Sequence, residues 1–331
     1  MFDESRCELC GDCLVRCQYI DYNQEKAKAQ IAALIEGDDA EILKDCITCV
    51  ACNEYCKHDA NPFDLIVQMQ EESETSYTSD AAIRFMDMGK RLPTRIIKGD
   101  PDKPVISLCV VGDLNSHLFE GKLFEGMTIL KGKDYYCHLG YVHTGMESTL
   151  RENLSNVVDN LAKFSSDEII FFHDDCYSAF TIKAEEYGID LPFEPVHIIE
   201  YLRDFMRDHQ DEVEKLNLNI AYQRPCASRY TPEKDLMLDE LFGLIGVERV
   251  KRKYDGIDAL CCGGPLAYVD KRKAREVRKR NLNDAKDAGA EAIAFLCPVC
   301  VMSMRDGVKE LGLGHYMLIE LCRMALCEMK G

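Results

Sequence analysis

The chain has 331 residues, of which 47% are hydrophobic and 30% charged, so we expect a globular protein of about two or three domains rather than a disordered one. A net charge of −18 excludes a long basic nucleic-acid-binding face. The acidic N-terminus lacks an apolar signal-peptide core, and no apolar segment is long enough to span a bilayer, which predicts a cytoplasmic protein. In that setting, 18 cysteines favour metal ligation over disulfides.

Two runs near the N-terminus share the spacing C-x2-C-x2-C-x3-C. They consist of Cys7, Cys10, Cys13 and Cys17, and of Cys46, Cys49, Cys52 and Cys56. This spacing is typical of cubane [4Fe–4S] clusters, and in two-cluster modules the fourth cysteine of each run binds the other cluster. Structural zinc would instead use thiolates in pairs. The predicted ligand sets are therefore Cys7, Cys10, Cys13 and Cys56 for one cluster, and Cys17, Cys46, Cys49 and Cys52 for the other.

The segment between the two runs is rich in Ala, Glu, Lys and Leu, which predicts helix with a break near Gly37. A helical connection between two such runs resembles the α-helical ferredoxin module of succinate dehydrogenase iron–sulfur subunits. The resemblance predicts an all-α, two-cluster ferredoxin domain over residues 1–85. A linker over residues 86–104 is expected to follow, because the turn-rich sequence GDPDKP closes it.

The rest of the chain contains an internal repeat. The pair Cys137-His138 precedes Cys261-Cys262 by 124 positions, and the same offset relates the segments that begin at His173 and at Cys297. Such a constant offset indicates a duplication. Each copy alternates strands and helices, which predicts an α/β fold with a small parallel sheet and with site residues at the carboxyl ends of its strands. The two copies are expected over residues 105–217 and 218–331.

The second copy carries the pattern C-x34-CC-x34-C-x2-C, formed by Cys226, Cys261, Cys262, Cys297 and Cys300. This pattern closely resembles the cysteine-rich CCG domain of heterodisulfide reductase, with relatives in glycolate, lactate and glycerol-3-phosphate oxidoreductase iron–sulfur subunits. The resemblance implies a noncubane [4Fe–4S] cluster held by five cysteines, at which a disulfide is cleaved in one-electron steps. Five ligands are one too many for zinc. We expect Gly263 and Gly264 to let the backbone approach the cluster.

The five corresponding positions of the first copy are not all cysteines. They are Cys109, Cys137, His138, His173 and Cys176. Two imidazoles replace thiolates, so this CCG-type domain is degenerate. Three alternatives remain open, namely zinc or another single metal, a modified iron–sulfur centre with histidine ligands, and an empty repeat. Cys109 is the weakest candidate, because it is expected well inside its strand.

The resemblance predicts an iron–sulfur subunit of a heterodisulfide-reductase-like oxidoreductase complex with anaerobic chemistry. Electrons would pass through two cubane clusters to a noncubane cluster that reduces a small disulfide or a similar acceptor. The alternative is a pure relay subunit without a substrate of its own. Because the sequence has no GxGxxG motif or phosphate-binding loop, we expect no flavin or nucleotide in this chain and a separate flavoprotein or other redox subunit as partner. The net charge of −18 predicts that nucleic acid is not a partner.

Two basic features carry less specific predictions. Arg224 and Arg229 flank Cys226, and they are expected to bind an anionic substrate, offset cluster charge or form salt bridges. The run KRKAREVRKR at residues 271–280 is expected to be a solvated helix face or a docking site for an acidic partner or an anionic substrate.

Overall fold

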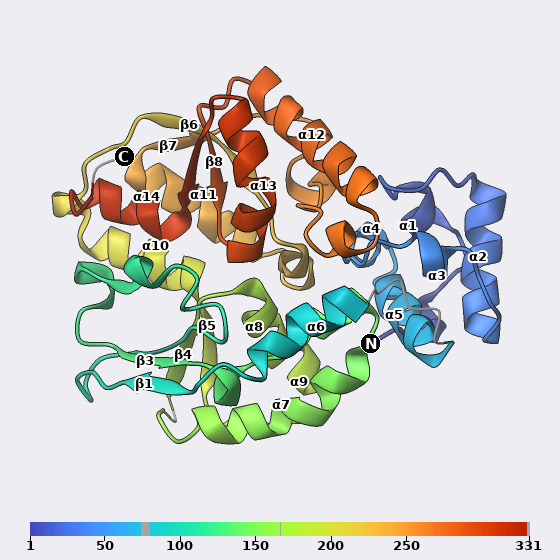
Figure 1. Ribbon diagram of the computed structural model, residues 1–331, viewed down its shortest axis with the longest axis horizontal. Helices are drawn as coiled ribbons and strands as arrows, with labels where there is room; N and C mark the ends of the chain where they lie inside the picture. Colours follow the sequence, from blue (N-terminus) through green and yellow to red (C-terminus); the bar gives the residue numbers. More distant parts are fainter. Residues whose placement is uncertain (74–79, 166, 330–331) are drawn as a thin grey trace.

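The computed structural model describes residues 1–73, 80–165 and 167–329. These ranges contain fourteen α-helices and two sheets of mainly parallel strands, which confirms the mixed α/β class. Figure 1 shows a helical N-terminal region at one end of the molecule and the two sheets, one above the other, at the other end. None of the described helices combines the length and the apolar character that a membrane span requires.

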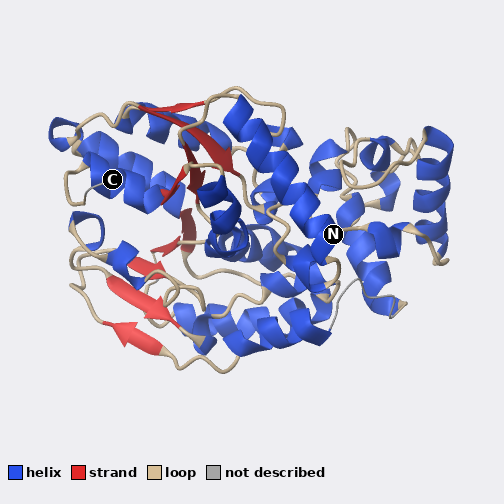
Figure 2. Ribbon diagram, turned by 45° about the horizontal axis from the view of Figure 1, so that its top comes forward, coloured by secondary structure: helices blue, strands red, loops and turns tan. Residues whose placement is uncertain are grey.

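The N-terminal region consists of helices only, as far as it is described (Figure 2). Its α-helices are α1 (Asp12–Val15), α2 (Gln24–Glu36), α3 (Ile42–Asp45), α4 (Ala51–Tyr55), α5 (Pro62–Glu72) and α6 (Asp80–Gly89). The Asn23 side chain caps α2 by accepting a hydrogen bond from the Lys26 N–H at 2.9 Å. The helix ends at Gly37, the predicted break, where φ is +79°.

The first sheet has the strand order β1-β3-β2-β4-β5. Its strands are β1 (Arg95–Ile97), β2 (Val105–Ser107), β3 (Thr128–Lys131), β4 (Glu168–Phe171) and β5 (Glu194–His197). All neighbours are parallel except β1, which pairs antiparallel with β3. Part of the segment expected to be a linker therefore extends this sheet. The short, exposed β1 was not predicted because three residues are too few to show the alternation of a strand.

The second sheet has the order β7-β6-β8-β9 and is entirely parallel. Its strands are β6 (Leu218–Gln223), β7 (Val247–Arg249), β8 (Ala292–Phe295) and β9 (Gly314–Met317). The same order, read as β3-β2-β4-β5, forms the parallel part of the first sheet. Two copies of one topology support the duplication inferred from the constant sequence offset.

Helices cover both sheets and join them. They are α7 (Glu147–Leu161), α8 (Asp174–Ser178), α9 (Ala184–Glu186), α10 (Ile198–Asp208), α11 (Lys234–Ile245), α12 (Lys271–Asp287), α13 (Pro298–Glu310) and α14 (Leu318–Ala325). Helix α10 follows the first sheet but packs against α11 and α14 of the second (Figure 1). One apolar core accordingly includes Ile170 of β4, Ile199 of α10 and Phe242 of α11, so the two copies form one packed body.

A buried lysine joins the helical region to the first copy. Lys183, in the π-helical turn Ala179–Lys183, has no exposed side-chain surface, and its Nζ donates to Asp64 Oδ1 of α5 at 2.5 Å. It also donates to Glu147 of α7 at 3.1 Å and to Glu186 of α9 at 2.8 Å. Burial alone would lower the pKa of Lys183, but the surrounding Tyr230 and carboxylates hold that pKa above its ordinary value.

We predict that Lys183→Met lowers the free energy of unfolding by about 3–5 kcal/mol, because it leaves buried carboxylates without their cation. The measurement is urea denaturation followed by circular dichroism. Lys163→Met is the matched control, since Lys163 is exposed and bonds only to Asn160 among the recorded contacts. Equal urea midpoints for the two variants would contradict a stabilising role for Lys183.

Candidate metal centres

The eight cysteines of the two N-terminal runs line two separate cavities. One cavity is lined by Cys7, Cys10, Cys13 and Cys56. The other is lined by Cys17, Cys46, Cys49 and Cys52. Each group combines three cysteines of one run with the fourth of the other, which is the crossed grouping that the spacing suggested. We call these groups the outer quartet and the inner quartet, respectively.

The backbone winds in the same way around both quartets. Leu9 and Gly11 have φ of +51° and +76°, and the corresponding Thr48 and Val50 have φ of +56° and +65°. Left-handed residues alternating with ordinary ones direct successive N–H groups toward one point, which favours a bound anion. One such group, the Thr48 N–H, donates to Cys46 Sγ at 3.3 Å. For a β-branched residue such as Val50 this conformation is costly, so local preference alone does not explain it.

Burial keeps the thiols of Cys13, in the outer quartet, and Cys46, in the inner quartet, neutral when no metal is bound. Burial is the largest influence on Cys13 and on Cys46, and it raises the pKa of each thiol to about 12. A metal that binds a thiol removes its proton, and the metal's positive charge then compensates the buried thiolate. The donor set of four sulfurs with N–H groups directed at them therefore fits an iron–sulfur cluster.

The five cysteines of the second copy form one continuous group of contacting sulfurs. The sequence of contacts runs through Cys226, Cys261, Cys262, Cys300 and Cys297, and all five thiols are free of disulfide bonds. The first contact, Cys226 Sγ to Cys261 Sγ, measures 3.6 Å. Cys226 follows β6 and Cys297 follows β8, so this sulfur group lies at the carboxyl ends of two adjacent parallel strands.

The two glycines after the cysteine pair lie between this sulfur group and helices α12 and α13. Gly263 has φ of +69°, and its N–H donates to Cys261 Sγ at 3.3 Å. A Cβ on Gly264 would lie 3.0 Å from Ser303 Oγ and 3.4 Å from Cys262 Sγ. A larger residue at Gly264 would therefore press on Ser303 of α13, whereas Cys262 Sγ would stay at an ordinary contact distance.

In the first copy, three cysteines come together. The sulfurs of Cys109, Cys137 and Cys176 all lie within 4.8 Å of one another and are buried. The expectation that Cys109 lies well inside a strand is wrong, because β2 ends at Ser107 and Cys109 adopts φ of +52° on the turn that follows. That turn allows Cys109 Sγ to accept a hydrogen bond from the Cys137 N–H at 3.4 Å.

The structure does not bring His138 and His173 into this group of three sulfurs. His138 stacks on Tyr136 with 4.2 Å between ring centroids, and its buried Nδ1 has no hydrogen-bond partner among the described residues. Burial lowers the pKa of His138 to about 4, which keeps its imidazole neutral. His173 instead lies against Cys297 of the second copy, and its Nδ1 is 3.5 Å from Asp175 Oδ2.

The inner quartet is directly next to the five-sulfur group of the second copy. Tyr19 OH accepts a hydrogen bond from the Cys261 N–H at 2.7 Å, and the same phenol is buried beside Cys49. Arg229 donates to the Ala259 carbonyl at 2.7 Å, and its charge partly opposes the increase that burial causes in the pKa of Cys49. The sequence pattern did not reveal Tyr19, because an isolated tyrosine after a cysteine run carries no signal of its own.

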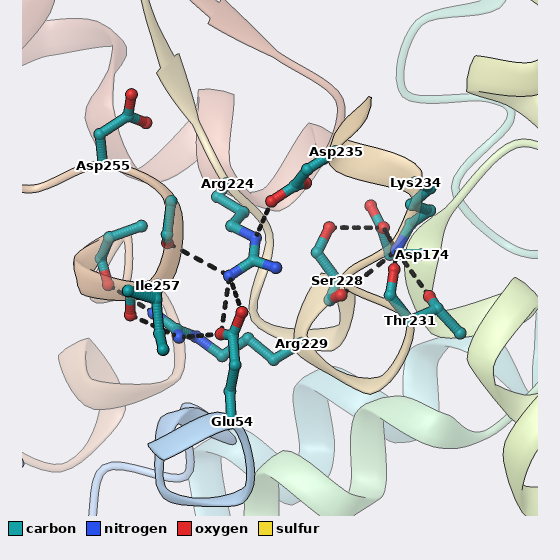
Figure 3. Close-up of polar contacts among 12 residues, drawn as sticks. Glu54, Asp174, Arg224, Ser228, Arg229, Thr231, Lys234, Asp235, Asp255 and Ile257 are labelled. Carbon is teal, nitrogen blue, oxygen red and sulfur yellow. Dashed lines mark hydrogen bonds and ion pairs between the residues drawn. The ribbon is translucent and has the colours of Figure 1, made fainter. Parts of the chain in front are cut away.

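An ion-pair cluster fixes this junction (Figure 3). Glu54 Oε2 of α4 lies 2.7 Å from Arg224 and 2.6 Å from Arg229, both of which are buried in the second copy. Arg224 also pairs with Asp235 at 3.1 Å. Of the three roles considered for these arginines, the structure supports salt bridges, because the Glu54 carboxylate forms ion pairs with both guanidinium groups. The sequence identified the arginines but gave no indication of their distant partner.

A second buried cluster joins the two copies (Figure 3). Asp174 Oδ1, next to His173, lies 3.1 Å from Lys234 Nζ and accepts a hydrogen bond from Ser228 at 2.6 Å. Although burial alone would raise the pKa of Asp174, the cation and the hydrogen bonds hold it well below its usual range. The carboxylate therefore stays ionised and locks α8 of the first copy onto the segment after β6.

Comparison with known proteins agrees with the cysteine pattern. Residues 220–305 match the family of cysteine-rich CCG domains. The chain is 26% identical over 198 residues to one component of the dihydromethanophenazine:CoB–CoM heterodisulfide reductase of Methanosarcina mazei, which covers 57% of this chain and 48% of the relative. It is 22% identical to one component of the CoM/CoB fumarate reductase of Methanothermobacter marburgensis, over 97% of this chain and 72% of that protein.

Among solved structures, a hypothetical protein from Helicobacter pylori aligns with 84% of this chain and 61% of its own length, with a TM-score of 0.55 and 14% identity. That likeness concerns the fold alone. The match to the heterodisulfide reductase component spans about half of that relative's length. Residues 220–305 thus form a cysteine-rich CCG domain, and the resemblance of this chain to heterodisulfide-reductase-like iron–sulfur proteins is confirmed.

Proposed function

We propose that this chain is an iron–sulfur subunit of a heterodisulfide-reductase-like complex that conducts electrons to a disulfide or a similar acceptor. The observation that carries the proposal is the arrangement of the sulfur groups in series. The outer quartet adjoins the inner quartet where Cys13 lies near Cys52. The inner quartet adjoins the five-sulfur group through Tyr19 and Arg229. A chain of neighbouring redox sites is what stepwise electron transfer requires.

In this proposal the two quartets hold cubane [4Fe–4S] clusters, and the five sulfurs of the second copy hold a noncubane one. The clusters, when bound, supply one-electron redox chemistry. The domains follow accordingly as an all-α ferredoxin domain (1–85), a linker (86–104) and two CCG-type domains (105–217 and 218–331). The matched methanogen proteins are both named as parts of larger reductases, which supports a redox partner, and we propose a flavoprotein.

The protein's own residues suit disulfide reduction, in which two electrons and two protons convert one disulfide into two thiols. His173 lies between Asp175 and Cys297 at the border of the two copies. Burial opposes its protonation, but Asp175 and Cys297 raise the pKa of His173 well above its usual value. A protonated imidazole can give its proton to a leaving thiolate, so His173 suits a proton donor better than a metal ligand.

The pure relay function remains a second candidate because of one observation. Cys261, Cys262, Cys297 and Cys300 are only 3–7% exposed, and Cys226 alone of this group is half-buried. A disulfide would therefore approach the five-sulfur group from the side of Cys226. A relay subunit would not need a substrate to reach the sulfurs, because electrons can be transferred through the protein to a partner bound at its surface.

The test of catalysis is stopped-flow spectroscopy of the anaerobic, dithionite-reduced protein mixed with small thiol disulfides. We expect reoxidation of the iron–sulfur absorption together with release of two thiols per disulfide. His173→Gln should slow thiol release by about 100-fold or more while leaving the reduced spectrum unchanged, because it removes only the proton donor. A stable reduced spectrum with every disulfide tried would leave only the relay function.

For the first copy we propose a single zinc ion held by Cys109, Cys137 and Cys176. His138 lies outside this group of sulfurs, so it becomes the fourth ligand only if its side chain turns when the metal binds; its buried Nδ1, which has no hydrogen-bond partner among the described residues, and its neutral imidazole make that turn chemically reasonable.

We predict that Cys137→Ser removes about one zinc ion per chain, measured by elemental mass spectrometry, without loss of iron. His173→Ala should retain the zinc. Cys322→Ser is the matched control, because Cys322 is an equally buried cysteine in the core. Unchanged zinc content in Cys137→Ser would contradict this site.

A further inference from the structure

Helix α12 carries a cationic face on an otherwise acidic molecule. Of the eight charged residues in its segment 271–280, seven are basic, although the chain as a whole has a net charge of −18. The exposed cations on its outer side are Lys271, Arg272, Arg275 and Lys279, which we call the α12 basic face.

The α12 basic face is largely unneutralised. Within the described ranges, no ion pair is recorded for Lys271, Arg275 or Lys279, and Arg272 only approaches Glu276 at 3.9 Å. The other cations of the segment have structural partners: Arg278 donates to the Ser303 carbonyl at 2.7 Å. Lys271, Arg275 and Lys279 follow one another at intervals of four residues, so their charges form one row along the helix.

The apolar side of α12 is already occupied. Ala274, Val277 and Leu282 are buried against the second copy. The helix therefore has no free apolar face that could enter a lipid surface. The rest of the molecule is strongly acidic and would repel the phosphates of a nucleic acid that extends beyond this one row of cations. A nucleic acid is therefore disfavoured as the partner.

Helix α12 reaches the inner quartet through two cations outside the α12 basic face, Lys273 and Arg280. Arg280 donates to the Gln18 carbonyl at 3.0 Å, next to Cys17. Half-buried Lys273 acts electrostatically on both Cys17 and Cys46, where it opposes the effect of burial. Figure 1 shows α12 extending from the second sheet to the helical N-terminal region.

Exposed apolar residues complete this surface. Tyr268 and Val269, immediately before α12, are 38% and 45% exposed. Protein interfaces combine a small apolar centre with a charged rim, and opposite charges accelerate encounter.

We propose that the α12 basic face docks an acidic, one-electron carrier protein that exchanges electrons with the inner quartet. This inference rests on the proposed function, because it requires a cluster there. Each reduced carrier gives up one electron, so two carriers are oxidised for each disulfide that takes up two electrons and two protons. The docking surface gives the relay an entry point that does not pass through the outer quartet.

The test uses an acidic plant-type [2Fe–2S] ferredoxin as the probe, photoreduced and mixed with the oxidised protein in a stopped-flow instrument at several salt concentrations. The variant is Lys271→Glu with Arg275→Glu and Lys279→Glu. The matched control, Arg95→Glu with Lys98→Glu and Lys103→Glu, makes the same change of charge around β1, at the far side of the molecule (Figure 1). Circular dichroism and iron content verify that both variants are folded.

We expect the α12 variant to reduce the second-order rate by about ten-fold or more at low salt and to lose most of its salt dependence, while the control stays within about two-fold of wild type. Equal rates for the α12 variant and wild type, or equal losses in both variants, would overturn the docking site. Tighter salt-sensitive binding of duplex DNA or phosphatidylglycerol vesicles to the α12 basic face than of ferredoxin would also overturn it.

Chemical reduction separates this inference from the proposed function. Dithionite reaches the clusters without docking, so wild type and both variants should bleach equally. Normal bleaching with an unaffected ferredoxin rate in the α12 variant would defeat the docking site alone. Absence of any bleaching would defeat the proposed function and the docking site together.

Discussion

The arrangement of the candidate redox sites depends on one buried carboxylate, that of Glu54, held between Arg224 and Arg229. Removing these charges from water is costly, and the cost is recovered only when each charge keeps its partners. Glu54 lies between Cys52 and Cys56 on α4, whereas Arg224 and Arg229 bracket Cys226. The ion pairs therefore place the inner quartet against the five-sulfur group, a position that apolar packing alone would specify less sharply.

The duplication explains where the two copies meet. His173 and Cys297 occupy equivalent positions in the repeat, 124 residues apart, yet they contact each other across the junction. The site regions of both copies thus converge on one zone at the carboxyl ends of their strands. The copies have diverged, so that the second copy has a group of five sulfurs and the first copy a group of three. The first copy contributes the imidazole of His173 to this junction rather than to its own sulfur group.

Much of the site could be predicted from the sequence because ligand spacing is a local property. Runs with two residues between cysteines must turn tightly around one centre, and the crossed quartets followed from the pattern of two-cluster modules, in which the fourth cysteine of each run binds the other cluster. What the sequence could not provide depends on contacts between distant segments. The pairing of Glu54 with two arginines, the phenol of Tyr19 at Cys261 and the direction of the His173 side chain are all of this kind. The small parallel sheet of each copy followed from the alternation of strands and helices, whereas β1, with only three residues, gave no alternating pattern.

The central claim is that thirteen cysteines converge in three sulfur groups that bind iron. Its most direct measurement is the iron and acid-labile sulfide content of the anaerobically purified chain, combined with EPR of the reduced and oxidised states. Three four-iron clusters predict about twelve irons and twelve sulfides per chain, with signals from two cubanes and a distinct third centre. A colourless protein containing only zinc, or one whose thirteen cysteines are joined in disulfides, would contradict the account.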